Sequence, residues 1–168
     1  MLDSAQLRPT GDRIRETLFN WLMEGIKGAR CLDLFAGTGI LGLEALSRGA
    51  QFVTFVEQEV ALSQQLKAIL KGLNAEKNSE VMTGDAYQFL KTQRDSQPYQ
   101  VVFLDPPFEN FIYPLIEGLA QSALLAQEAW IYIEQRIPLE PDKLPSGWDL
   151  VKQKATGQVH YHLVKCGG

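Results

Sequence analysis

Cysteine and histidine are scarce in this chain of 168 residues, which holds two of each. Cys31 and Cys166 lie far apart, and no CxxC pair or Cys/His ligand spacing occurs. This pattern argues against a zinc site and favours a reduced protein without disulfides. His160 and His162 alternate on one expected strand, and with no third ligand nearby we interpret them as surface histidines. We therefore expect no metal.

The chain also lacks an excess of positive charge, since its formal net charge is −4 and its pI is near 5.2. That balance argues against a polycation that wraps naked nucleic acid, although it leaves room for a local basic patch. No basic-then-apolar leader starts the chain, and no charge-free stretch is long enough to span a bilayer. We expect a cytoplasmic protein with no membrane partner.

A hydrophobic content of 45% is enough for one core, so we expect a single domain over residues 1–168. Strand-like and helix-like segments alternate through residues 29–134, which predicts βαβ units and a mostly parallel sheet with helices on both faces. The expected strands are Cys31–Phe35, Phe52–Val56, Glu80–Thr83, Val101–Leu104 and Ala129–Ile133. The expected helices are Leu41–Ser47, Ala61–Leu73, Ala86–Thr92 and Ile112–Leu125.

Different patterns flank this βαβ core. Residues 1–28 form an N-terminal segment in which the apolar spacing predicts a helix over Asp12–Ile26. Residues 137–147 are rich in proline and predict a loop. Residues 148–166 predict an antiparallel hairpin of Trp148–Lys154 and Val159–Lys165, in which Tyr161 points to the core.

A glycine-rich turn follows the first expected strand. Gly37-x-Gly39-x-x-Gly42 fits a dinucleotide fingerprint, and Glu57 ends the second strand, 57 − 37 = 20 residues on, where an acid would bind ribose hydroxyls. A nicotinamide enzyme must therefore be weighed. Asp33 favours S-adenosylmethionine instead, because an anion at this strand end would repel a pyrophosphate but could orient a cationic methionyl group.

Acids stand at four successive strand ends, namely Asp33, Glu57, Asp85 and Asp105. For Asp33 or Asp85 alone, helix capping would be the preferred interpretation. Four such acids together indicate a ligand site, in which Asp85 could accept a hydrogen bond from an adenine amino group. Open α/β sheets bind their ligands at this edge.

The sequence Asp105-Pro106-Pro107-Phe108 directly follows the apolar run Tyr99–Leu104. The first proline forces Asp105 toward extended geometry, so the chain leaves the sheet in a stiff turn. Taken alone, the motif is as consistent with an ordinary turn as with a site that fixes a carboxylate, a carbonyl and an aromatic ring.

These motifs together resemble the Rossmann-like methyltransferases that use S-adenosylmethionine, and most closely the RsmD family. The resemblance rests on LRPTGDRIRETLFNWL (residues 7–22), LDLFAGTGILGLEALSRGA (32–50), FVEQE (55–59), GDA (84–86), DPPF (105–108) and GQVHYHLVK (157–165). It implies a class I methyltransferase fold with a seven-stranded sheet and a C-terminal antiparallel hairpin. The family usually begins with a basic, glycine-containing arm, and no such stretch precedes Leu2.

The resemblance also implies an activity, methylation of a guanine N2 amine in bacterial 16S ribosomal RNA, with S-adenosylmethionine as cofactor. The catalytic residues would be Asp105, Pro106, Pro107 and Phe108. The cofactor would contact Asp33, Phe35, Gly37, Thr38, Gly39, Glu57, Asp85 and Ala86. Arg8, Thr10, Asp12 and Arg15 are candidate substrate residues, with a role in capping and solvating the first helix as an equal alternative.

Competing functions stay open at this point. The same tetrapeptide type serves adenine-N6 methylases of DNA or RNA, and the fold could also be a non-catalytic cofactor-binding RNA module. We expect a monomer whose substrate is 16S ribosomal RNA within a small-subunit particle. Residues 105–142 hold seven acids and one arginine, whereas the hairpin holds three lysines and one aspartate, so few phosphate contacts are available.

Overall fold

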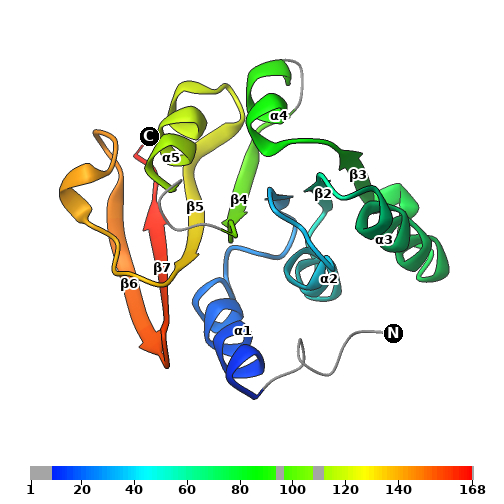
Figure 1. Cartoon of the computed structure of the whole chain (residues 1–168), viewed down its shortest axis with the longest axis horizontal. Helices are drawn as coiled ribbons and strands as arrows, with labels where there is room; N and C mark the ends of the chain where they lie inside the picture. The colour runs from blue at the N-terminus through cyan, green and yellow to red at the C-terminus, as the bar shows by residue number, and fades with distance from the viewer. Residues whose placement is uncertain (1–8, 94–96, 108–111, 168) are drawn as a thin grey trace.

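The computed structural model describes residues 9–93, 97–107 and 112–167. Its centre is a seven-stranded sheet with the order β3-β2-β1-β4-β5-β7-β6 (Figure 1). The strands are β1 (Arg30–Asp33), β2 (Phe52–Glu57), β3 (Ser79–Thr83), β4 (Tyr99–Leu104), β5 (Leu125–Gln135), β6 (Asp149–Thr156) and β7 (Val159–Lys165). The first five pair in parallel, and β7 is antiparallel to both β5 and β6. The mostly parallel sheet with a terminal hairpin is therefore confirmed.

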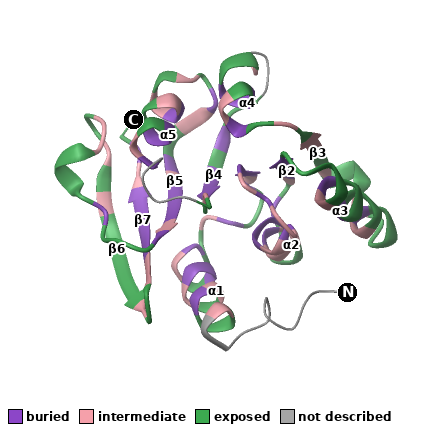
Figure 2. Cartoon of the chain, viewed as in Figure 1, coloured by how far each residue is buried: buried purple, intermediate pink, exposed green. Residues whose placement is uncertain are grey.

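Helices cover both faces of this sheet. They are α1 (Pro9–Trp21), α2 (Ile40–Ser47), α3 (Val60–Gly72), α4 (Ala86–Thr92) and α5 (Ile112–Gln121), with short 3₁₀ turns η2 (Glu76–Asn78) and η4 (Pro141–Lys143). One buried cluster joins α1, α2 and α3 to the sheet, and a second joins α4 and α5 to the opposite face. Figure 2 shows the buried residues concentrated in the central strands and on the helix faces turned toward them.

The strand order places the ligand edge of the sheet. The chain passes from β1 outward through β2 to β3, then returns to place β4 on the other side of β1. Crevices outside the carboxyl ends of strands form at such a reversal. The ends of β1 and β4 therefore lie side by side, with Asp33 paired to Phe103 two residues before Asp105.

Helices α1 and α5 end several residues earlier than the sequence predicts. Helix α1 stops at Trp21 rather than Ile26, and the following backbone bonds tighten, since the Met23 N–H donates to the Asn20 carbonyl and the Gly25 N–H to the Leu22 carbonyl, each three residues earlier. Ile26 is nevertheless buried, as its apolar spacing indicated. Helix α5 stops at Gln121, where the Ser122 hydroxyl donates to the Leu119 carbonyl and accepts from the Leu124 N–H.

His162 corrects the interpretation of both histidines as surface residues. Its side chain is buried on β7, where Nδ1 contacts the Ile133 carbonyl at 3.0 Å and Nε2 accepts the Leu139 N–H at 3.0 Å. Because a backbone N–H can only donate, Nε2 must be unprotonated and Nδ1 carries the proton. Burial is the main cause that lowers the His162 pKa. His162 thus fastens the loop after β5 to the sheet.

The terminal hairpin turns over fewer residues than expected, since β6 continues to Thr156 and only Gly157 and Gln158 separate it from β7. Tyr161 is buried, as predicted, and its ring stacks on Trp21 of α1 with centroids 5.4 Å apart. Across the described ranges, no helix is long and apolar enough to cross a membrane. The same ranges hold no group of three or more His, Cys, Asp or Glu side chains that could bind a metal ion.

Candidate functional site

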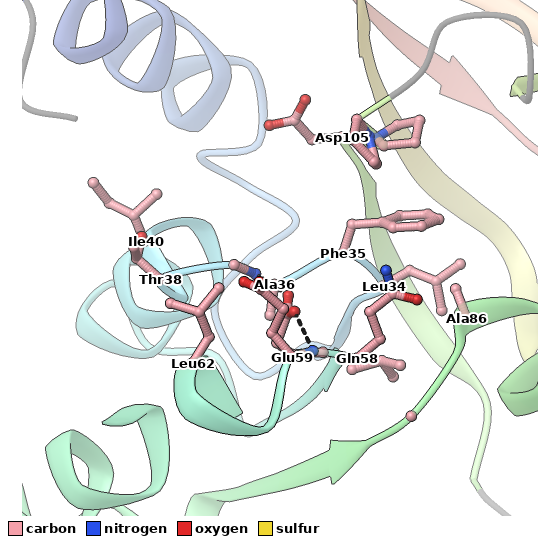
Figure 3. Close-up of a pocket in the computed structure, with 16 residues that line it drawn as sticks. Leu34, Phe35, Ala36, Thr38, Ile40, Gln58, Glu59, Leu62, Ala86 and Asp105 are labelled. Atoms are coloured by element: carbon pink, nitrogen blue, oxygen red, sulfur yellow. Dashed lines mark hydrogen bonds between the residues drawn. The ribbon is translucent and has the colours of Figure 1, made fainter. Parts of the chain in front are cut away.

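A cavity of about 640 Å³ opens at the carboxyl ends of β1, β2 and β4 (Figure 3). Its size is within the range of pockets that bind cofactors and small ligands. Apolar side chains and loop backbone form most of its wall, and the acidic residues in it are Glu57, Glu59 and Asp105. The lining residues are Leu34, Phe35, Ala36, Gly37, Thr38, Ile40, Val56, Glu57, Gln58, Glu59, Leu62, Gly84, Ala86, Asp105, Pro106 and Pro107.

Glu57 ties together two loops at the cavity wall. The Gly37 N–H donates to its Oε1 and the Glu59 N–H donates to its Oε2, each at 2.8 Å. The residue is 9% exposed, so water screens these bonds little. Glu57 therefore fixes the glycine turn after β1 and the start of α3, and each oxygen keeps a further lone pair for a ligand.

The glycine turn depends on a backbone conformation that other residues rarely adopt. Gly39, the N-cap of α2, has φ +84°, and a Cβ at this position would lie 2.5 Å from Leu66 Cδ1 of α3. Glycine therefore allows α2 and α3 to approach each other beneath the turn. Gly37 and Thr38 line the cavity, whereas Gly39 lies behind them.

Asp33 lies behind the cavity wall and not on it. The residue is 2% exposed, and its carboxylate accepts the Gly42 N–H in the first turn of α2 at 3.1 Å. Burial raises the Asp33 pKa to about 7; the bond from Gly42 opposes this shift and the charge of Glu57 adds to it. Asp33 therefore contacts α2. Its predicted orientation of a cationic methionyl group would act through its negative charge.

Residues at the end of β3 form another part of the wall. Gly84 and Ala86 line the cavity together with Phe35, which is half-buried. Asp85 between them is exposed, caps α4 and accepts the Gln88 N–H at 3.2 Å. Its carboxylate is outside the lining, so its predicted contact with an adenine stays a prediction.

Asp105, Pro106 and Pro107 form the wall at the end of β4, and Figure 3 shows the Asp105 carboxylate at the side of the cavity that faces α1. Asp105 is exposed to solvent at the edge of the cavity, and nearby protein atoms remove part of the water around its carboxylate. This desolvation raises the Asp105 pKa well above its usual value, and the charges of Glu134 and Asp33 add to the shift. Phe108 lies outside the described residues.

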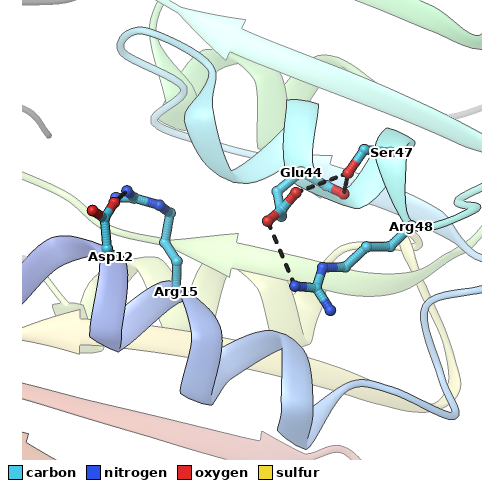
Figure 4. A network of polar contacts seen from close by, with 5 residues as sticks. All are labelled: Asp12, Arg15, Glu44, Ser47 and Arg48. Atoms are coloured by element: carbon cyan, nitrogen blue, oxygen red, sulfur yellow. Dashed lines mark hydrogen bonds and ion pairs between the residues drawn. The ribbon is translucent and has the colours of Figure 1, made fainter.

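Helix α1 places part of the expected substrate group beside Asp105. Arg15 donates a hydrogen bond to Asp12 one turn earlier (Figure 4), and with Asp105 it lines a second pocket of about 100 Å³. The side chain of Thr10 and all of Arg8 lie outside the description.

Glu134 is a residue of this site that the sequence analysis missed. It lies at the end of β5, lines the second pocket with Asp105, and accepts a hydrogen bond from the Tyr132 hydroxyl at 2.8 Å. The pattern of acids at strand ends could have indicated it, because Glu134 follows the fifth expected strand directly. The four acids of that pattern lie at the ends of the first four expected strands, so the fifth strand was not included.

A family model, curated relatives and solved structures all relate this chain to one protein family. The family model "Conserved hypothetical protein 95" matches residues 1–165. The chain is 45% identical to Ribosomal RNA small subunit methyltransferase D of Haemophilus influenzae over 97% of its length and 85% of that protein. The protein of the same name from Escherichia coli K12 is 46% identical, over 96% of this chain and 80% of its own. The solved structure of Escherichia coli yhhF has a TM-score of 0.85 at 42% identity, covering 95% of this chain and 88% of that one.

Proposed function

The chain belongs to the RsmD family, described as conserved hypothetical protein 95, and on this premise we propose that it is a ribosomal RNA methyltransferase. The proposed reaction moves a methyl group from S-adenosylmethionine to the exocyclic N2 amine of a guanine in small-subunit ribosomal RNA. The observation that carries this proposal is the position of Asp105, which lines both the large cavity and the smaller pocket beside it.

The large cavity suits S-adenosylmethionine in its size and its wall. Glu57 would accept hydrogen bonds from the ribose hydroxyls, and Phe35 and Ala86 offer apolar surface to an adenine. Gly37 and Thr38 would border the methionyl part. When bound, the cofactor supplies an electrophilic methyl group, and the protein's part is to hold the acceptor nitrogen in line with it.

The acceptor amine needs help because its lone pair is delocalised into the guanine ring. Asp105 and the carbonyl of its peptide bond to Pro106 would accept the amine hydrogens, which favours a pyramidal nitrogen with a localised lone pair. Neither Pro106 nor Pro107 carries an N–H, so these two positions offer backbone carbonyl acceptors and no backbone donor. The target base must leave its stack to reach this point, as in other enzymes that modify bases.

Nucleoside mass spectrometry tests the reaction directly. Small-subunit RNA from cells that lack the gene should lose one N2-methylguanosine, which wild-type protein should restore and Asp105→Ala should not. Loss of an N6-methyladenosine instead would favour the adenine methylase. An unchanged nucleoside profile together with tight RNA binding would favour a non-catalytic module.

We further propose that the substrate is an assembled particle and that the protein acts as a monomer in the cytoplasm. Among the described residues, few exposed arginines and lysines lie on the segments expected to face RNA, namely Arg13 on α1 and Lys152 and Lys154 on the edge strand β6. So few phosphate contacts would bind naked RNA weakly and with a shallow salt dependence. Methylation of small subunits should therefore exceed that of protein-free 16S RNA, and the opposite order would contradict this part of the proposal.

A further inference from the structure

The smaller pocket lies between α1 and the carboxyl edge of the sheet, and Asp105 is common to it and to the large cavity. Under the proposed function the large cavity takes the cofactor. The smaller pocket is then the place from which an acceptor base approaches Asp105. Its lining residues are Gly11, Ile14, Arg15, Ile40, Leu41, Asp105 and Glu134.

Two carboxylates come together here because β4 and β5 are parallel neighbours. Leu104 pairs with Ile133 at the end of their ladder, so Asp105 and Glu134 follow as the next residues at the same edge. The preceding residues on the same face, Phe103 and Tyr132, pack edge to face with ring centroids 6.4 Å apart. This packing holds both strand ends in register.

Glu134 is held in place but keeps capacity to accept more hydrogen bonds. The Tyr132 hydroxyl donates to Oε2, and within the described residues this is the one hydrogen bond that reaches the carboxylate. Oε1 is therefore left for a ligand. The positive charge of Arg15 and the Tyr132 bond both lower the Glu134 pKa, against a larger effect of burial that raises it.

The paired charges favour a ligand edge that offers several N–H donors. The charge of Glu134 raises the Asp105 pKa, which means that the two carboxylates repel each other in the free protein. An edge that donates to both of them relieves this repulsion. A ligand edge that places a hydrogen-bond acceptor against Glu134 adds to the repulsion.

The Watson–Crick edges of the purines differ in this respect. Guanine presents the N1–H beside the N2 amine, so two adjacent positions donate. Adenine presents an acceptor at N1. An ionised carboxylate only accepts, so it can pair with the guanine N1–H and not with the adenine N1.

We propose that Glu134 accepts the N1–H of the target guanine while Asp105 holds the adjacent N2 amine, so that the pair of carboxylates selects guanine. This role rests on the proposed function and adds to it the residue that determines base specificity. Tyr132 acts as a positioning residue, because its hydroxyl orients the Glu134 carboxylate without reaching the base.

The test uses small subunits assembled from 16S RNA that carries either guanine or 2-aminopurine at the mapped target position. 2-Aminopurine keeps the N2 amine but has an acceptor at N1. Wild-type protein should prefer guanine in kcat/KM by about 100-fold or more, since a site built for an N–H rejects an analogue without it. The analogue also lacks O6, which affects all protein variants alike, so the change in this preference between variants isolates Glu134.

Glu134→Gln is the decisive variant, because its amide can donate to the N1 of 2-aminopurine. The preference for guanine should fall by about 10- to 100-fold, the range expected for one charge-assisted hydrogen bond. Affinity for S-adenosylmethionine, measured by calorimetry, should stay unchanged. Tyr132→Phe is the matched control: it keeps the carboxylate and should retain the preference for guanine while lowering kcat/KM.

Two results would overturn this role for Glu134. One is a wild-type protein that methylates both purines with similar kcat/KM, a measurement that needs no variant to fold. The other is Glu134→Gln with the same preference for guanine as wild type. A wild-type protein that forms no N2-methylguanosine on guanine-containing subunits would overturn the proposed function itself, and this role with it.

Discussion

Replacing Glu57 tests whether one side chain supports both the cofactor cavity and the stability of the fold. Its oxygens accept the Gly37 and Glu59 N–H groups at 2.8 Å each, and the residue is 9% exposed. A hydrogen bond to a charged group contributes about 1.5–3 kcal/mol. Glu57→Ala removes both bonds, although water can reach the half-buried Gly37 and the exposed Glu59, so the free energy of unfolding should fall by at most roughly 3–6 kcal/mol.

Glu57→Gln provides the graded control. Its amide oxygen can accept one N–H, but its NH₂ group faces the other donor, so the loss should be smaller than for Glu57→Ala. Urea unfolding followed by the fluorescence of the three tryptophans measures both losses. Calorimetry should also show at least a roughly tenfold weaker affinity for S-adenosylmethionine in Glu57→Ala, equivalent to about 1.4 kcal/mol.

The reasoning fails if Glu57→Ala unfolds with nearly the same free energy as wild type, because two charge-assisted bonds would then contribute nothing. It fails in another way if stability falls but affinity for the cofactor does not. Glu57 would then only stabilise the two loops, and the ribose would bind elsewhere on the cavity wall.

Three further predictions concern other parts of the site and its support. Asp105→Asn should abolish most methyl transfer at near-normal cofactor affinity, and near-normal turnover in the variant would exclude the mechanism. Because the pKa of Asp105 is raised, wild-type turnover should increase with pH as this carboxylate becomes ionised. Gly39→Ala should destabilise more than Gly28→Ala: both glycines have positive φ, but an added Cβ would clash with Leu66 at Gly39 and meets nothing within 4 Å at Gly28. Equal losses of unfolding free energy would contradict this. The pKa of His162 is lowered in the folded protein, so the unfolded chain gains a proton first as the pH falls. The contribution of His162 to stability should therefore be present above pH ~6.5 and decline below it. Unfolding free energies of wild type and His162→Gln that differ equally at pH 5 and pH 8 would refute this.

The grouping of Gly37, Thr38 and Glu57 around one cavity, which we propose for the cofactor, could be predicted because these residues are local in sequence. The glycine turn follows β1 directly, Glu57 ends the next strand, and their contact joins two neighbouring strands of one βαβ unit. Parallel sheets bring such strand ends to one edge, so residue type and spacing are enough. What the sequence could not indicate is that Asp33 turns its carboxylate toward the N–H of Gly42 and away from the cavity.

The acceptor half depends on contacts between distant segments. Arg15 and Glu134 lie more than a hundred residues apart and line one pocket, because α1 packs on the face of the sheet where β4 and β5 end. No periodicity in either segment encodes that meeting. The acidic pattern at strand ends did extend to Glu134, but only the strand order shows that β5 lies beside β4 and not at the far edge.

The terminal hairpin acquires a part in the site through His162. Strand β6 is a mostly exposed edge of the sheet. Strand β7 is not, because His162 contacts the Ile133 carbonyl and accepts the Leu139 N–H, so it holds the chain on both sides of Glu134. A substitution at His162 should therefore alter discrimination between guanine and 2-aminopurine as well as stability, because the end of β5 carries the carboxylate that faces Asp105.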